Sequence, residues 1–167
     1  KERKNKKILK VSELVKIISS SKKRDFKKKI NGCTKTFQAL RIFVNKEISE
    51  LIGGIILATK FLKTGGKIIV VSFHSIEDKI VKYYFSSYSK NQTKPSRYLP
   101  DAKVKNQIFF ENYKNLVLRA NEFEVKENPP SRSAKLRYAI RSNSNFIYPK
   151  DLKNRFKKYL DLERLND

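Results

Sequence analysis

The sequence predicts an α/β fold in which one buried strand leads through a short polar elbow into a helix. The strand is indicated by the apolar run 68–71, which follows the pair Gly65-Gly66 and reads as covered on both faces. A long helical stripe over 34–62 precedes this strand, and an alternating segment over 134–141 follows it. At 167 residues the chain has about the length of one domain and can bury a real core.

Two helical regions are expected before the strand. Residues 8–20 carry a short apolar stripe, and the apolar positions between Thr34 and Leu62 recur at spacings of three and four. Asn45 interrupts this second pattern and is expected to divide it into two helices.

The elbow that follows the strand contains His74, the only histidine of the chain. Ser75 suits the N-cap of the next helix, which is expected to run to about Tyr88, with Asp78 at the N3 position of a capping-box-like arrangement. In a parallel sheet, ligands bind outside the carboxyl ends of the strands, so Ser72 and its neighbours would face a ligand crevice. Such junctions also occur where they only cap a helix, and the purely structural interpretation therefore stays open.

The last third of the chain combines an irregular segment with two further strands and a helix. Residues 89–107 are expected to form an exposed loop, 116–120 a short strand, and the residues after Pro149 an amphipathic helix. The strand 134–141 alternates cleanly, which predicts a buried apolar face and a basic face. The apolar face comprises Ala134, Leu136, Tyr138 and Ile140, and the opposite face Lys135, Arg137, Ala139 and Arg141.

Two local patterns admit more than one interpretation. Four tyrosines interleave with basic residues, which suits base stacking and phosphate binding but also suits helix packing beside a solvated loop: Tyr83, Tyr84, Tyr88 and Tyr98 with Lys82, Lys90, Lys94 and Arg97. The run Asn128-Pro129-Pro130-Ser131 resembles the loop with which amino-methyltransferases hold a target amine. It follows a charged stretch and not an apolar strand, so a rigid turn is the favoured interpretation.

Charge indicates a polyanionic partner. The chain has 39 Lys and Arg against 16 Asp and Glu, a formal net charge of +23, which makes nucleic acid the first expectation. No run approaches the about 20 apolar residues of a membrane span, so no membrane partner is expected. The single Cys33 fits a reducing, cytoplasmic setting, and one cysteine with one histidine cannot form a zinc site.

The sequence gives no sign of a complete cofactor site. It contains neither a G-x-G-x-x-G loop nor a Walker sequence, and its two glycine pairs do not follow a strand. The chain has no methionine and begins within the charged run 1–4, which indicates a fragment of a longer protein.

Three sequence blocks, in order, carry a resemblance to a known family. Residues 33–47 are similar to TRTFQALRIAVNxEL, residues 65–82 to GGRLxVISFHSLEDRIVK, and residues 128–141 to NPxxRSAKLRxAxR. Over residues 8–141 the chain thus resembles the S-adenosylmethionine-dependent cytosine-N4 methyltransferases of small-subunit ribosomal RNA, the MraW or RsmH family. It departs from them at Asn31-Gly32, where His-Pro is usual, and at Lys35, where arginine is usual.

The resemblance implies a Rossmann-like class I methyltransferase sheet, of which this chain is the C-terminal portion. Residues 1–45 would end a helical substrate-recognition insertion, 46–145 would close the methyltransferase domain, and 146–167 would form a helical tail. The longer protein would transfer a methyl group from S-adenosylmethionine to N4 of a cytidine in small-subunit rRNA, on the RNA or the ribosomal subunit. The cofactor site would lie upstream, so no cofactor-binding residue is expected in this chain, and the isolated fragment is expected to be inactive.

On this interpretation, two sets of residues are candidates for the site. Ser72, His74, Ser75 and Asp78 would lie near the target base, with Asn45 as a possible acceptor for its amine. Lys35, Arg41, Arg132, Lys135 and Arg137 would hold RNA phosphates. The alternative is a non-catalytic RNA-binding or ribosome-assembly module on a methyltransferase-like fold, in which the same basic residues form a solvated face.

Overall fold

The computed structural model describes residues 2–5, 7–21, 33–91 and 107–164. The chain forms two compact units, one of Lys1–Glu47 with Glu163–Asp167 and one of Ile48–Leu162. Most of the loop expected over 89–107 lies outside the described residues. Among the helices that are described, none is long and apolar enough to cross a membrane.

The first unit consists of short helices. They are α1 (Glu2–Asn5), α2 (Val11–Ser21) and α3 (Thr34–Val44). Asn45 is the C-cap of α3 and donates its backbone N–H to the carbonyl oxygen of Arg41 at 3.0 Å. Lys46 follows with a φ of +50°, and α4 begins at the next residue, which confirms that the long apolar stripe is divided at Asn45.

The second unit contains a three-stranded sheet. Its strands are β1 (Lys67–Ser72), β2 (Leu118–Arg119) and β3 (Lys135–Ile140). The order is β1-β3-β2, and β3 is antiparallel to both neighbours. The strands at 68–71, 116–120 and 134–141 are therefore confirmed, but the parallel sheet assumed for the ligand crevice is not found among the described strands.

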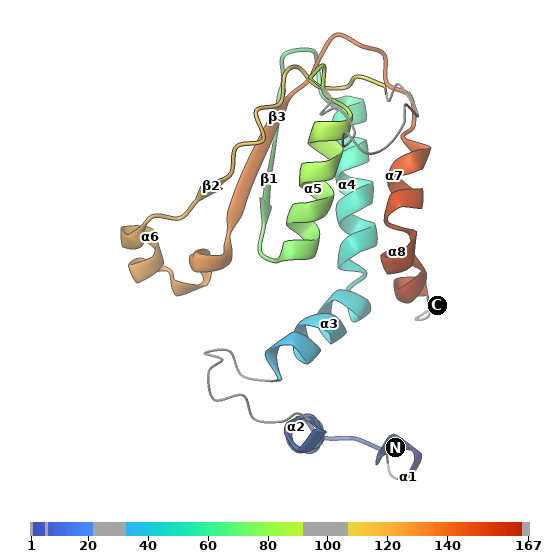
Figure 1. The fold of residues 1–167 in the computed structure, drawn as a ribbon, viewed down its shortest axis with the longest axis vertical. Coiled ribbons are helices and arrows are strands. Elements are labelled where there is room, and N and C mark those ends of the chain that lie inside the picture. The colour runs from blue at the N-terminus through green and yellow to red at the C-terminus, as the bar shows by residue number, and fades with distance from the viewer. Residues whose placement is uncertain (1, 6, 22–32, 92–106, 165–167) are drawn as a thin grey trace, which may run out of the picture. The chain divides into compact units, whose positions relative to one another are not determined.

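Helices of the second unit lie on one side of this sheet, and α5 packs against β1 and β3. They are α4 (Glu47–Phe61), α5 (Ser75–Ser87), α7 (Lys150–Arg155) and α8 (Lys157–Arg164). Figure 1 shows α5, α4 and α7 side by side on the same side of β1 and β3. The short helix α6 (Glu122–Glu127) and the 3-10 turn η1 (Pro129–Ser133) connect β2 to β3, so the prolines form the expected rigid turn.

An aromatic core fastens α5 to the segment before β2. Tyr84 and Tyr88 are 0% and 1% exposed, and the Tyr88 ring stacks on Phe109 with 5.0 Å between centroids. The Tyr84 hydroxyl donates to Thr59 Oγ1 at 3.1 Å, which ties α5 to α4. These two tyrosines serve helix packing and not base stacking, whereas Tyr98 lies outside the described residues.

The other face of the sheet is apolar and exposed. Ile69 and Val71 of β1 are 59% and 49% exposed, and they stand opposite Tyr138 and Leu136 of β3. Residues directly opposite each other in an antiparallel pair share a face, so these side chains form one contiguous surface. The expectation that this strand is covered on both faces is therefore wrong within the described residues, where helices cover one face only.

The faces of β3 are the reverse of those expected. Arg137, Ala139 and Arg141 are buried, at 4%, 3% and 5% exposure, while Tyr138 of the supposedly buried face is 38% exposed. The alternation of β3 is confirmed, but hydrophobicity alone does not predict which of its faces is buried. The helical layer offers the Asp78 carboxylate and the Thr59 carbonyl group, and the segment before β2 offers the Phe109 carbonyl group, which makes burial of the arginines possible.

Arg141 shows how such burial is stabilised. Its Nε donates to the carbonyl oxygen of Thr59 at 3.2 Å, and its Nη1 donates to those of Phe109 at 2.9 Å and Ser142 at 3.1 Å. Its Nη2 donates to the carbonyl oxygen of Ser144 at 2.7 Å. One side chain thus joins the last turn of α4, the segment before β2 and the segment after β3.

Replacing Arg141 tests this arrangement. Arg141→Met is expected to lower the free energy of unfolding by about 3 kcal/mol, because several buried carbonyl groups lose their donors. Urea unfolding followed by tyrosine fluorescence measures the change. Arg132→Met removes an exposed arginine and is expected to cost less than about 0.5 kcal/mol. Equal losses of stability in the two variants would show that the hydrogen bonds of Arg141 do not stabilise the fold.

Candidate functional site

The elbow after β1 is held to the neighbouring strand. Ser72 is 2% exposed, and its Oγ donates to the carbonyl oxygen of Lys135 at 3.3 Å. Phe73 comes next and is 53% exposed, because the alternation of β1 turns it toward the uncovered face of the sheet. The elbow thus combines a buried serine with an exposed aromatic ring.

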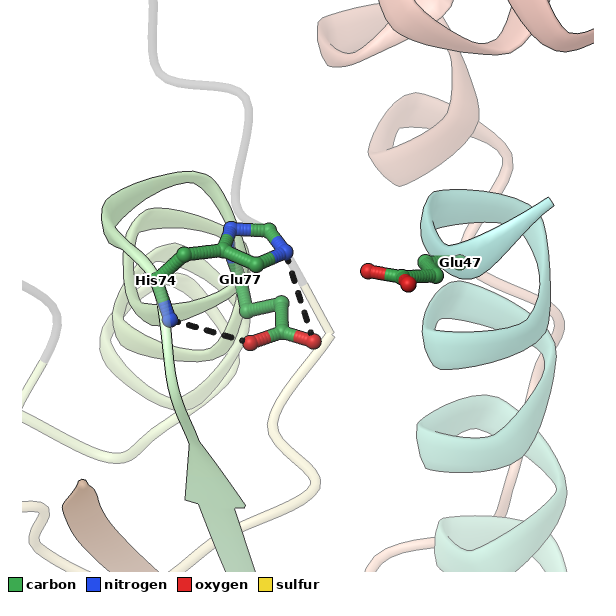
Figure 2. Close-up of side chains that lie close together, drawn as sticks. All are labelled: Glu47, His74 and Glu77. Carbon is green, nitrogen blue, oxygen red and sulfur yellow. Dashed lines mark hydrogen bonds and ion pairs between the residues drawn. The ribbon is translucent and has the colours of Figure 1, made fainter. Parts of the chain in front are cut away.

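His74 is the N-cap of α5. Its Nδ1 accepts the backbone N–H of Glu77 at 3.3 Å, and Glu77 Oε2 accepts the backbone N–H groups of His74 at 3.2 Å and Phe73 at 2.9 Å. Figure 2 shows the imidazole ring and the Glu77 carboxylate side by side at the start of the helix. The two side chains therefore satisfy N–H groups that the first turn of a helix leaves without partners.

The expected cap was wrong by one residue. Ser75 is the first helical residue and is exposed, and Asp78 does not complete a capping box. The statistical preference of serine for N-caps favoured Ser75, whereas the extended backbone of His74, with φ −136° and ψ 164°, makes it the last residue before the helix. Part of the function of the histidine is therefore structural.

Asp78 forms an ion-paired cluster with β3. Its Oδ1 accepts from Arg137 Nε at 2.7 Å, and its Oδ2 accepts from Lys135 Nζ at 2.9 Å. The side chains of Asp78 and Arg137 are 14% and 5% exposed, so the pair is largely shielded from water. This cluster fixes the first turns of α5 against β3, directly beside the elbow.

The pKa values in the cluster follow from this geometry. Burial raises the pKa of Asp78, but hydrogen bonds and charge from Arg137 and Lys135 outweigh it and hold the pKa below its usual value of 3.8. Burial lowers the pKa of Arg137, yet its bonds to Asp78 and Tyr113 raise the pKa overall. Both groups are therefore charged throughout the neutral pH range.

Two members of this cluster were not singled out from the sequence. Arg137 Nη1 donates to the Tyr113 hydroxyl at 3.0 Å and to Asn115 Oδ1 at 2.9 Å. Asn115 has a φ of +53°, a conformation that asparagine tolerates better than most residues. An asparagine after a lysine carries no sequence signal of this role, because its partner Arg137 lies on β3, far along the chain.

The candidate residues fall into separate groups. Asp78, Lys135 and Arg137 are brought together, and Ser72 bonds to the backbone of Lys135. Arg132 is exposed on η1. Three further candidates belong to the first unit: Lys35 and Asn45 are exposed, and Arg41 donates to Glu47 at 2.7 and 3.2 Å.

Two hollows lie outside the elbow. One, of about 490 Å³, is in the first unit and is lined by Val15, Cys33, Thr34, Phe37, Gln38 and Arg41. The other, of about 290 Å³, is in the second unit and is lined by Lys82, Ser86, Asn91, Tyr113 and Asn115. Neither includes a residue of the elbow.

Comparison with known proteins decides the family. The family model described as "MraW methylase family" matches residues 1–142, which include all three sequence blocks and the elbow. The chain belongs to the MraW methylase family.

Curated relatives agree with this family. The chain is 44% identical over 120 residues to Ribosomal RNA small subunit methyltransferase H of Bartonella henselae, covering 72% of this chain and 34% of that protein. It is 43% identical over 131 residues to the protein of the same name from Agrobacterium fabrum, covering 78% and 37%. The chain thus spans about a third of the length of the curated relatives that it matches.

The MraW-family block at the elbow can be tested for its capping function. His74→Ala is expected to lower the free energy of unfolding by about 1 kcal/mol, because the N–H of Glu77 loses its acceptor, and His74→Asn is expected to restore most of it. Ser75→Ala is expected to change it by less than about 0.5 kcal/mol. Thermal unfolding followed by circular dichroism compares the three, and a larger loss in Ser75→Ala would reverse the cap assignment.

The ion-paired cluster predicts a pH-dependent contribution to stability. Asp78→Asn is expected to cost about 3 kcal/mol at pH 7, because it leaves the buried Arg137 without its carboxylate. Since folding lowers the pKa of Asp78, its contribution is full above about pH 5 and is lost as the pH falls through the lowered pKa. Urea unfolding between pH 7 and pH 2.5 should therefore show the difference between wild type and Asp78→Asn shrinking below about pH 4. Glu122→Gln on exposed α6 is the matched control, and a difference that is constant with pH would contradict the ion-pair account.

Proposed function

We propose that this chain is part of an S-adenosylmethionine-dependent methyltransferase that modifies N4 of a cytidine in small-subunit rRNA. The observation that carries the proposal is the family match over residues 1–142, together with relatives named as small-subunit rRNA methyltransferases. The net charge of +23 supports a polyanionic substrate, and small-subunit rRNA is the one that these names suggest. The reducing, cytoplasmic setting that the single Cys33 suggests is part of this proposal.

We further propose that the sheet is the end of a larger, Rossmann-like one. Among the described strands, only β3 pairs with β1, so the other edge of β1 offers its backbone groups to a further strand. The face carrying Ile69 and Val71 is apolar and exposed, which suits coverage by further helices. On this proposal, the first 45 residues close a substrate-recognition insertion and the last about 20 form a helical tail.

We expect the site for the cofactor to lie mainly outside this chain. The sequence has no glycine-rich loop, and neither hollow includes the elbow. S-adenosylmethionine would supply the methyl group, and its binding residues would come from sequence outside these 167 residues. We therefore assign no cofactor contact to this chain, and we expect the chain alone to be inactive.

The elbow is proposed to form one wall of the site for the target base. Chemistry on a base requires it to be unstacked, and the exposed Phe73 ring and Ser75 hydroxyl are available to such a base. Ser72, His74 and Asp78 would act by positioning, because their side chains are held by β3 or by the first turn of α5. A rigid elbow suits catalysis, because it requires no reorganisation when the base arrives.

Phosphate contacts are proposed for the exposed basic residues. Lys35, Arg41 and Arg132 lie at the surface, and Lys135 is partly exposed beside Asp78. Arg137 is better suited to positioning than to direct contact, because its guanidinium is buried and already bonded. Asn45 is exposed at the end of α3 and stays a candidate acceptor for the target amine.

A non-catalytic RNA-binding or ribosome-assembly module is the second candidate. The high positive charge fits this candidate too, since a net charge of +23 suits a protein that binds RNA without a cofactor. The two candidates make different demands on the rest of the protein, because only the enzyme needs a cofactor site there.

Methyl transfer distinguishes these functions. The intact protein carrying this sequence is expected to transfer radiolabel from S-adenosylmethionine to small-subunit rRNA or to a subunit particle, with N4-methylcytidine as the labelled nucleoside. Asp78→Asn should lower the rate at least about tenfold by loosening the elbow, while Glu122→Gln should leave it unchanged. If calorimetry shows that the protein binds the cofactor, and the protein binds RNA but transfers no methyl group, the enzymatic proposal is wrong and the binding module is favoured.

A further inference from the structure

The hollow beside α5 is built from polar groups that converge from three segments. Lys82 and Ser86 lie one turn apart on α5, Asn91 follows this helix, and Tyr113 and Asn115 precede β2. Its volume of about 290 Å³ is just below the range of about 300–1,000 Å³ for drug-sized ligand pockets and leaves room for a small anion. No acidic residue lines it.

The acceptors at this hollow are already occupied. Asn91 Oδ1 accepts the backbone N–H of Tyr113 at 2.8 Å and the Ser89 hydroxyl at 2.9 Å, while its Nδ2 donates to the carbonyl oxygen of Tyr113 at 3.0 Å. Asn91 therefore fixes the Tyr113 backbone in place. The amide retains one N–H, because only one of its two is used within the described residues.

Arg137 bonds to two side chains that line the hollow. Its Nη1 donates to both the Tyr113 hydroxyl oxygen and Asn115 Oδ1. The Tyr113 hydroxyl proton and the Asn115 amide N–H groups have no acceptor among the described residues, so both can donate to a ligand. Burial raises the pKa of Tyr113, which keeps this hydroxyl protonated and able to donate.

The charge below the hollow is not balanced. Asp78 is the one carboxylate bonded to both Lys135 and Arg137, so the cluster carries a surplus positive charge. Lys82 adds an ammonium group at the rim, and within the described part of the chain it pairs with no carboxylate. A shielded surplus charge beneath a set of donors is the electrostatic arrangement that an anion compensates.

We propose that this hollow binds a phosphate group, with Lys82 as its counter-charge and Tyr113, Asn115 and Ser86 as hydrogen-bond donors. The phosphate could belong to an RNA backbone or to a free phosphate ion, and the same donors serve both. The site is separate from the elbow, since none of its lining residues lies within 72–78. Binding of a free phosphate ion does not depend on the proposed function. Binding of an RNA phosphate rests on it.

Titration with inorganic phosphate tests the pocket directly. The intact protein carrying this sequence is titrated by calorimetry at constant ionic strength, with chloride as the reference anion. Lys82→Gln is expected to weaken phosphate binding about tenfold, because a charge-assisted bond is lost. Lys79→Gln makes the same charge change at an exposed position of the same helix, and it should change affinity less than about twofold. Equal effects of the two variants, or no binding by the wild-type protein, would overturn the proposal.

Tyr113→Phe separates binding from folding. This variant keeps the buried ring but removes the hydroxyl proton, and it should weaken phosphate binding about tenfold. Its unfolding free energy is measured alongside, because Arg137 also loses an acceptor. A variant that stays folded and still binds phosphate with wild-type affinity would contradict the role of the tyrosine as a donor.

A short single-stranded RNA separates the two sources of the phosphate. If the phosphate belongs to RNA, Lys82→Gln lowers RNA affinity more than Lys79→Gln does, and inorganic phosphate competes with the RNA. If RNA affinity falls equally in both variants while phosphate binding is lost only in Lys82→Gln, the ligand is a free phosphate ion. Methyl transfer is measured on the same variants. If the protein transfers methyl groups but does not bind phosphate, the proposed function holds and the phosphate site is wrong. If it binds phosphate but transfers no methyl group, the phosphate site holds and the proposed function is wrong.

Discussion

The burial of two arginines on the inner face of β3 is the constraint on which the rest of the second unit depends. A buried guanidinium has five N–H donors, each of which needs an acceptor that water would otherwise provide. Arg141 obtains its acceptors from backbone carbonyls, and Arg137 obtains its own from a carboxylate and two neutral side chains. The segments that supply them, which include the end of α4 and residues 109–115, must therefore adopt matching conformations.

The elbow gains its rigidity from the same source. Asp78 is placed by the capping box one turn earlier in the chain, and it then pairs with Arg137, whose charge would be costly to bury alone. In return, this pair holds the first turns of α5 against the sheet. His74 thus joins a local hydrogen-bond pattern to a long-range ion pair, and this coupling keeps the family block in one geometry.

Most of the elements could be predicted because their signals are local. The division at Asn45, the strand after Gly65-Gly66 and the turn at Pro129 each follow from neighbouring residues. The site was predicted only in outline. Asp78, Lys135 and Arg137 were all selected, but their mutual bonds were not, because the residues lie on different elements far apart in sequence.

By itself, the sequence determined the alternation of β3, the position of the elbow and the family blocks, since each depends on periodicity or on a contiguous motif. Only the tertiary structure decided which face of β3 is buried, because a basic face can enter the core when other segments supply its acceptors. It also decided that His74, and not Ser75, caps α5, because the residue that leaves the helical conformation sets the cap. The orientation of a strand is a property of its neighbours, and no pattern within the strand contains it.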